Sequence, residues 1–234
     1  MAGMGKRMRP HTLTIPKPLI NIAGKPIVQR LVEDLMALVD EKVDEIAFII
    51  GDFGAEVEEH LLNIATSVGS KGKIYYQNQA LGTAHAISCA AESISGKVIV
   101  AFADTLFKTT QKMDTSREGI IWVHKVEDPS AFGVVKTDSK DIVTKFIEKP
   151  TSPVSNQAIV GVYYFREGEV LRAEIDKLLA AKVLVNGEYQ LTDVLENMMQ
   201  RGCSFSVYNV GEWLDCGNKN ATIHTNRRIL DFAK

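Results

Sequence analysis

The stretch EIAFIIG at residues 45–51 decides the fold, because a mostly apolar run of six residues ends there at a glycine. Such a run is typical of a buried strand. An amphipathic helix is expected at 55–65, and a second strand at 73–76. The alternation continues with a helix at 83–92 and a strand at 97–102. This order predicts an α/β fold in which helices cover a parallel or mixed sheet.

The flanking sequence extends this pattern in two ways. Before it, Pro26 precedes apolar residues at helical spacing, which predicts a helix with Pro26 in its first turn. After residue 119 the strands come closer together, which indicates an antiparallel or mixed half. These later strands are expected at 120–124, 132–136, 142–147, 159–165 and 204–210. The remaining helices are expected at 168–182, 191–201 and 218–232. We therefore predict one domain in two lobes over residues 1–234.

Composition and charge argue against several classes of protein. The formal charge of -2 leaves no broad basic field for a nucleic-acid backbone, so no nucleic-acid partner is expected. Three widely spaced cysteines, Cys89, Cys203 and Cys216, suggest neither a disulfide framework nor a zinc ribbon. No apolar run approaches the roughly 20 residues of a membrane span, and the first residues do not resemble a signal peptide. We expect a soluble, cytoplasmic protein with no membrane partner, and the sequence leaves a homo-oligomer open.

A short basic segment with two glycines opens the sequence. Gly3 and Gly5 stand beside Lys6 and Arg7. Backbone amides at glycines approach phosphate oxygens closely, and the cations neutralise charge there, so the segment predicts a phosphate-binding loop. It is not a Walker A loop, because Arg7 stands where Ser or Thr would follow the lysine. It also lacks the third glycine of the dinucleotide fingerprint, since Met8 occupies that position. A plain flexible terminus is the alternative interpretation of this segment alone.

Together with later motifs, this loop resembles the sugar nucleotidyltransferase family, which includes glucose-1-phosphate thymidylyl-, uridylyl- and guanylyltransferases. The resemblance covers nearly the whole chain. It is carried, in the family's order, by GMGKRMRP at 3–10, PKPL at 16–19, QNQALGTA at 77–84, AFADTLF at 101–107, FGVV at 132–135, EKP at 148–150, SNQAIVGVY at 155–163, GEYQLTD at 187–193 and WLDCG at 213–217. Lys6 departs from the family's Thr or Ser, which removes a hydroxyl from the loop and adds a cation.

The resemblance implies the family's fold and a role for residues in each motif. The fold would be the nucleotide-diphospho-sugar transferase type, a Rossmann-like mixed sheet in a three-layer α/β/α arrangement. Arg7 and Lys17 would be the catalytic cations, and Asp104 and Asp215 would hold a magnesium ion, Mg²⁺. The nucleotide would be bound by Gly3, Gly5, Gln77 and Gly82. The sugar phosphate would be bound by Gly133, Glu148, Lys149, Gly161, Tyr163 and Glu188.

Several of these positions also have a structural interpretation. Asp104 follows an apolar strand at its carboxyl end, where open α/β sheets place ligands, yet an Asp there also suits a turn cap. Tyr163 lies in an apolar strand and fits the core as well as a pocket. Glu188 also fits the start of the helix that follows. The five histidines show no short ligand spacing, so a zinc site is not expected.

The implied reaction joins a nucleoside triphosphate to a sugar 1-phosphate. A phosphate oxygen of the sugar attacks the α-phosphorus in line, and pyrophosphate leaves. We expect dTTP and glucose 1-phosphate as substrates, with UTP as the next triphosphate. The alternatives are a cytidylyl- or guanylyltransferase of the same fold, or a regulatory subunit that binds nucleotide sugars without turnover. Retention of Arg7, Lys17, Asp104 and Asp215 argues against the regulatory subunit.

Family members usually have further segments at both ends of this region. An apolar strand precedes the glycine loop in the family, and many members continue into a β-helix of hexapeptide repeats. These 234 residues begin with the loop and end after a predicted helix, so we expect neither segment within them. A protein made only from these residues is expected to have poor activity and a mobile segment from residue 1 to about residue 10, because the loop lacks its supporting strand. We also expect it to aggregate through exposed sheet edges.

Overall fold

The computed structural model describes residues 8, 15–152, 154–182, 184–185 and 187–232. The chain divides into two compact units. The first unit comprises Met1–Asn78, Phe102–Met113 and Gly211–Lys234, and the second comprises Gln79–Ala101 and Asp114–Val210. Each unit has its own arrangement of strands and helices. That the two units form one domain stays a prediction from the sequence.

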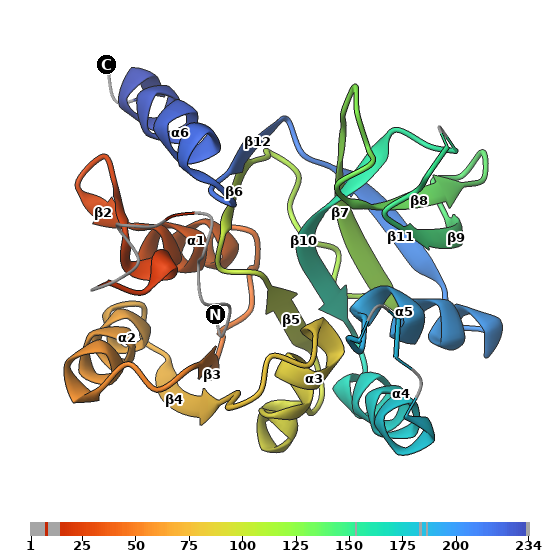
Figure 1. Cartoon of the computed structure of the whole chain (residues 1–234), viewed down its shortest axis with the longest axis horizontal. Coiled ribbons are helices and arrows are strands. Elements are labelled where there is room, and N and C mark those ends of the chain that lie inside the picture. The colour runs from red at the N-terminus through yellow and green to blue at the C-terminus, as the bar shows by residue number, and fades with distance from the viewer. Residues whose placement is uncertain (1–7, 9–14, 153, 183, 186, 233–234) are drawn as a thin grey trace. The chain divides into compact units, whose positions relative to one another are not determined.

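A strand–helix–strand segment forms one part of the first unit (Figure 1). β3 (Glu45–Ile50) pairs in parallel with β4 (Lys71–Tyr76), and α2 (Ala55–Ser67) connects them. α1 (Ile27–Met36) shares a buried apolar cluster with this segment. The buried members of the cluster are Val28, Val32, Phe48, Ile50, Leu61, Ile64 and Ala65. The parallel crossover predicted from the sequence is confirmed.

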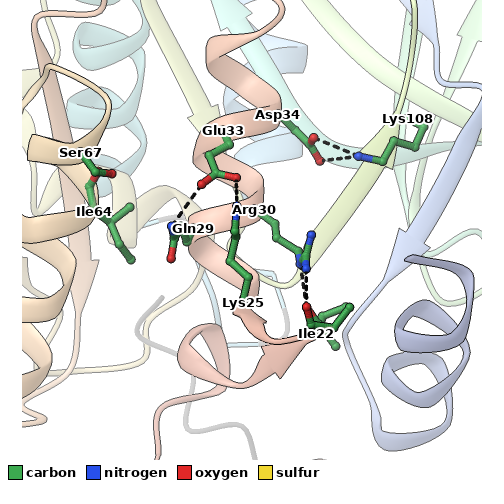
Figure 2. Close-up of polar contacts among 10 residues, drawn as sticks. Ile22, Lys25, Gln29, Arg30, Glu33, Asp34, Ile64, Ser67 and Lys108 are labelled. Carbon is green, nitrogen blue, oxygen red and sulfur yellow. Dashed lines mark hydrogen bonds and ion pairs between the residues drawn. The ribbon is translucent and has the colours of Figure 1, made fainter. Parts of the chain in front are cut away.

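A two-stranded ribbon forms another part of the first unit. β6 (Thr105–Lys108) pairs antiparallel with β12 (Glu212–Asp215). α6 (Lys219–Phe232) packs against β12. Figure 2 shows that Lys108 on the ribbon pairs with Asp34 on α1, with Nζ 3.0 Å from Oδ1. The ribbon is therefore tied both to α1 and to the last helix.

A short hairpin precedes α1 and corrects one expectation. β1 (Asn21–Ile22) pairs with β2 (Lys25–Pro26), and Arg30 donates from Nε to the carbonyl of Ile22 at 2.7 Å. The prediction that Pro26 lies in the first helical turn was wrong, because Pro26 pairs with Asn21 in extended conformation and α1 begins at the next residue.

A six-stranded mixed sheet forms the second unit. Its strands are β5 (Val98–Ala101), β7 (Gly119–Lys125), β8 (Gly133–Thr137), β9 (Val143–Glu148), β10 (Gln157–Phe165) and β11 (Phe205–Asn209). The order is β11-β7-β10-β8-β9, and β5 also pairs with β10. β11 runs parallel to β7, whereas β10 pairs antiparallel with β5, β7 and β8. The antiparallel or mixed half expected after residue 119 is confirmed.

Three helices of the second unit pack against one another. They are α3 (Thr83–Ser88), α4 (Gly168–Ala181) and α5 (Leu191–Gln200), and α5 also packs against β9. α3 is shorter than predicted, since it ends at Ser88 and a separate 3-10 turn follows at Ala91–Ser93. Within the described part of the chain, no helix is long and apolar enough to cross a membrane.

An aromatic group fills the core of the second unit. Phe205 is 1% exposed, and its ring meets Phe146 edge-on with centroids 5.6 Å apart. Phe165 meets the same ring at 6.2 Å, again edge-on. Phe205 thus packs edge-on against two aromatic rings. Because cores are close-packed, these rings would not fill the space left by a smaller side chain at position 205.

We predict that Phe205→Ala lowers the free energy of unfolding by about 3–5 kcal/mol, because it leaves a cavity in this core. Phe53→Ala removes the same atoms from a loop position that is 37% exposed, and we expect a loss below about 1 kcal/mol. Urea denaturation followed by circular dichroism measures both. Equal losses in the two variants would contradict the packing described for Phe205.

Candidate active site

Two acids and a lysine meet at one end of the ribbon in the first unit. Asp104 immediately precedes β6, and Asp215 ends β12 opposite Thr105. The N–H of Cys216 donates to the carbonyl of Asp104 at 2.9 Å, which holds the two acidic segments side by side. Lys17 Nζ lies 2.7 Å from Asp104 Oδ2. Three residues of separate motifs are thus brought together.

The Lys17–Asp104 ion pair joins a nearly buried cation to an accessible anion. The side chain of Lys17 is 10% exposed, whereas that of Asp104 is 42% exposed. A desolvated ammonium requires a counter-charge, and Asp104 supplies it. The pair therefore holds Lys17 in place while Asp104 stays within reach of a ligand.

Asp215 is held from its side chain and from its backbone. Its Oδ1 accepts the N–H of Gly217 at 2.7 Å. A side chain at Gly217 would place Cβ 2.8 Å from that oxygen, so glycine allows the carboxylate to fold back. The carbonyl of Asp215 accepts the hydroxyl of Thr225, a fully buried residue of α6, at 2.8 Å. These contacts limit the positions that the carboxylate can take.

The ribbon itself is locked next to the acids. Trp213 Nε1 donates to Thr105 Oγ1 at 2.8 Å, across the two paired strands. Thr105 directly follows Asp104, and Trp213 lies two residues before Asp215. A shift of one strand along the other would break this bond and move one acid away from the other.

The donor set suits a magnesium ion shared with a substrate. Mg²⁺ prefers oxygen ligands and is commonly held by one or two carboxylates together with phosphates. Among the residues that the structure describes, no group of three or more His, Cys, Asp or Glu side chains is arranged to hold a metal ion. Two adjacent carboxylates therefore fit an ion that a phosphate completes.

The neighbouring thiol is unreactive. Burial raises the pKa of Cys216 to about 12, and the negative charges of Asp215 and Asp104 contribute to the shift. The thiolate is the nucleophilic and metal-binding form of cysteine, so Cys216 stays neutral and packs as a core residue.

Gln77 lies at the carboxyl end of β4. Its N–H donates to the carbonyl of Ile50, the last residue of β3, at 2.8 Å, and the residue is 8% exposed. Open α/β sheets place ligands at this end of parallel strands. The position is compatible with the predicted reading of a base, which stays a prediction.

The glycine loop is described at one position. Met8 is 2% exposed, and its Sδ lies 3.6 Å from the hydroxyl of Thr222 on α6. Gly3, Gly5 and Arg7 lie outside the described residues. Their roles at the phosphates stay predictions from the sequence.

The second unit brings Glu148, Lys149 and Gly133 together. Gly133 on β8 pairs with Glu148 on β9, and a side chain at Gly133 would place Cβ 3.1 Å from Glu148 Oε2. Lys149 Nζ lies 3.8 Å from Glu148 Oε1, and its side chain is 59% exposed. The hydroxyl of Thr192 donates to Glu148 Oε2 at 3.2 Å. A carboxylate and an accessible cation thus lie at the end of β9.

Two further predicted residues lie in β10. Gly161 has φ of 93° and lies where the register between β10 and β7 shifts. Tyr163 is 3% exposed, and burial raises the pKa of its hydroxyl, with the charge of Glu148 contributing. Tyr163 is therefore a core residue that lies close enough to Glu148 to feel its charge. Its contact with a sugar stays a prediction.

Gly82 and Glu188 lie next to each other in the second unit. A side chain at Gly82 would place Cβ 3.0 Å from Cβ of Glu188. Glu188 is exposed, and its Oε2 accepts the side-chain N–H of Gln190 at 2.9 Å. One predicted nucleotide residue and one predicted sugar residue are thus neighbours.

Asp193 is a candidate site residue that the sequence analysis did not single out. Its Oδ2 is buried and has no hydrogen-bond partner within the described residues, and burial raises its pKa. Burial also raises the pKa of Glu148, and the charges of Asp193 and Glu188 add to that shift, while Thr192 and Lys149 oppose it. The charges of two neighbouring acids therefore act on Glu148. The sequence feature that could have pointed to Asp193 is its place after Thr192 in the first turn of α5.

Comparison with known proteins places this arrangement in a family. A model of the nucleotidyl transferase family matches residues 1–231. The chain belongs to the nucleotidyl transferase family. The resemblance to sugar nucleotidyltransferases predicted from the motifs is thereby confirmed.

Two relatives match almost all of this chain. One is the low-salt glycan biosynthesis nucleotidyltransferase Agl11 of Haloferax volcanii, which is 30% identical over 98% of this chain and 64% of its own length. The other is a glucose-1-phosphate thymidylyltransferase of Streptomyces antibioticus, which is 29% identical over the same shares of the two chains. The chain thus spans less than two thirds of the length of these members of the nucleotidyl transferase family.

A solved structure shares the fold. The crystal structure of apo UDP-glucose pyrophosphorylase superposes with a TM-score of 0.79, at 23% identity, and covers 100% of this chain and 97% of that one. At this identity the likeness shows the fold. It confirms the predicted mixed α/β fold of a nucleotide-diphospho-sugar transferase.

We predict that Glu148→Gln raises the melting temperature at pH 7–8. Burial raises the pKa of Glu148 in the folded protein above its ordinary value of 4.5, so the ionised form destabilises the folded state above that pH. Below pH 4.5 Glu148 is protonated in both states, and the gain should shrink there.

Thermal melts of both proteins between about pH 3.5 and about pH 8 measure this effect. Glu127→Gln at an exposed position controls for the change in net charge. A gain for Glu148→Gln that does not vary with pH would contradict the assignment to ionisation of this carboxyl.

Proposed function

We propose that the protein transfers a nucleotidyl group from a nucleoside triphosphate to a sugar 1-phosphate and releases pyrophosphate. The observation that carries this proposal is the Lys17–Asp104 ion pair beside Asp215 at the end of the ribbon, in a chain of the nucleotidyl transferase family. The reaction brings two polyanions together, so cations are needed where charge develops. Lys17, and a magnesium ion held by Asp104 and Asp215, meet that need.

The chemistry requires no general base and no covalent intermediate. The attacking oxygen belongs to the phosphate of the sugar and is already an anion. It forms a bond to the α-phosphorus, and the bond from that phosphorus to the oxygen of pyrophosphate breaks. Bound magnesium would neutralise and orient the phosphate oxygens. The ammonium of Lys17 is held in position by Asp104, which places a positive charge at this site.

The second unit supplies the groups for the sugar 1-phosphate. Lys149 is accessible and carries the charge that would anchor its phosphate. Glu148 and Glu188 offer carboxylate oxygens to the sugar's hydroxyl groups, with Gly133 making room beside Glu148. Gln77 and Gly82 are proposed to select the base. Arg7 and the glycine loop are proposed to bind the triphosphate.

We propose dTTP and glucose 1-phosphate as the preferred substrates, with UTP next. One relative of this chain is a glucose-1-phosphate thymidylyltransferase, which supports this choice. Pyrophosphate release should be measured with dTTP, UTP, CTP and GTP against glucose 1-phosphate and mannose 1-phosphate. The fastest release is expected with dTTP and glucose 1-phosphate. A preference for CTP or GTP would overturn the proposed specificity. Binding of dTTP without any release would indicate a regulatory subunit.

We predict that Asp104→Asn and Asp215→Asn each lower turnover about 100-fold or more, because each removes a charged ligand of the proposed metal. Asp34→Asn is the matched control, since Asp34 also pairs with a lysine of the first unit, at 3.0 Å. It should keep turnover within about threefold of the wild type. Turnover measured over a magnesium titration distinguishes metal binding from misfolding. Near wild-type turnover in either acid variant, with the same magnesium requirement, would refute the metal assignment.

Lys149→Ala is expected to raise the Michaelis constant for glucose 1-phosphate by about tenfold or more, because a charge-assisted contact to phosphate is lost. The Michaelis constant for dTTP should change little. Lys145→Ala, at an exposed position of β9, is the control for loss of a nearby lysine. Steady-state kinetics in both substrates measure the effect. A change confined to dTTP would move Lys149 to the other substrate.

A further inference from the structure

The segment around Gly82 is bonded directly to the segment around Glu188. The N–H of Tyr189 donates to the carbonyl of Leu81 at 2.8 Å, and the N–H of Ala84 donates to the carbonyl of Tyr189 at 3.0 Å. Gly82 has φ of 104°, and a side chain there would place Cβ 2.5 Å from the carbonyl oxygen of Tyr189. The two backbones are therefore in direct contact, and only glycine fits between them.

The hydroxyl of Thr83 extends this junction to the start of α5. Thr83 Oγ1 accepts the N–H of Leu191, the first residue of α5, at 2.9 Å. The first amides of a helix have no partner within the helix. The residue before α5, Gln190, provides no side-chain cap. Thr83, 108 positions earlier in the chain, caps α5 in its place.

The residues on either side of Leu191 hold the two carboxylates proposed for the sugar. Before it, Gln190 is 8% exposed and donates from Nε2 to Glu188 Oε2 at 2.9 Å. After it, Thr192 donates from Oγ1 to Glu148 Oε2 at 3.2 Å. A displacement of Leu191 would therefore move both hydrogen-bond donors. The Thr83 bond thus restrains the residue that lies between the donors to Glu188 and Glu148.

We propose that Thr83 is a positioning residue that couples the two substrates of the proposed reaction. A triphosphate that contacts the Gly82 segment restrains Thr83, and Thr83 restrains Leu191. Glu188 and Glu148 are then oriented before the sugar 1-phosphate arrives. Binding of the sugar 1-phosphate therefore loses less conformational entropy when the triphosphate is already bound. This inference rests on the proposed function. The coupling must be reciprocal, so the sugar 1-phosphate tightens triphosphate binding by the same factor.

Calorimetry on the full chain tests the coupling without turnover. The dissociation constant of glucose 1-phosphate is measured with and without the α,β-methylene analogue of dTTP in the presence of magnesium. In the wild type the analogue should lower that constant by about fivefold or more. Thr83→Val replaces the hydroxyl by a methyl group, and the factor should fall below about two. Thr83→Ser keeps the hydroxyl and should keep the wild-type factor.

A matched control removes the same kind of bond elsewhere. Thr109 Oγ1 accepts the N–H of Gln111 at 3.1 Å in the first unit. Thr109→Val should leave the coupling factor unchanged. The affinity for the analogue alone should stay within about twofold of the wild type in every variant.

Three results would overturn the proposal. The first is an absence of coupling in the wild type. The second is full coupling in Thr83→Val. The third is clearly weaker binding of the analogue alone by Thr83→Val, which would make Thr83 a nucleotide ligand. Failure of the wild type to bind the analogue at all would instead refute the proposed function.

Hydrogen exchange of the wild type tests the same inference if Thr83→Val does not fold. The analogue alone should slow amide exchange in residues 188–192, because it restrains the junction before any sugar is bound. Unchanged exchange in these residues, with the analogue bound, would overturn the proposal.

Discussion

The pairing of β6 with β12 is the constraint on which the candidate catalytic centre depends. It sets Asp215 opposite Thr105 and therefore next to Asp104, although the two acids are far apart in the sequence. Two neighbouring carboxylates repel each other unless a cation lies between or beside them. Lys17 neutralises one of them through a contact of 2.7 Å. The remaining negative charge is what a magnesium ion, shared with a triphosphate, would satisfy.

The parts of the fold that local sequence determines were predicted well. β3 occupies Glu45–Ile50, as expected, because an apolar run closed by a glycine is typical of a strand. β6 and β12 were not predicted as strands. Each has four residues, and their stability comes from pairing with each other and from the bond of Trp213 to Thr105 across 108 positions. The tertiary structure decides which strand pairs with which, so neither four-residue segment carries a clear strand pattern of its own.

The same distinction applies to the candidate site. The motifs predicted roles for Lys17, Asp104 and Asp215, but not the ion pair between the first two. Asp193 and Thr83 lie within these motifs, but the sequence predicts no role for them, because a buried oxygen without a hydrogen-bond partner and a helix cap from a distant threonine appear only in three dimensions. Their chemistry depends on what surrounds them, and their residue type alone is common in surfaces and turns.

Asp104 and Asp215 are proposed to bind the triphosphate through a magnesium ion. Calorimetric binding of dTTP with and without magnesium, to the wild type and to a variant that combines Asp104→Asn with Asp215→Asn, tests it most directly. We expect magnesium to tighten wild-type binding by about tenfold or more. We also expect metal-free dTTP to bind the double variant more tightly than the wild type, because the repulsion between carboxylates and phosphates is removed. Wild-type binding that does not depend on magnesium would contradict the claim.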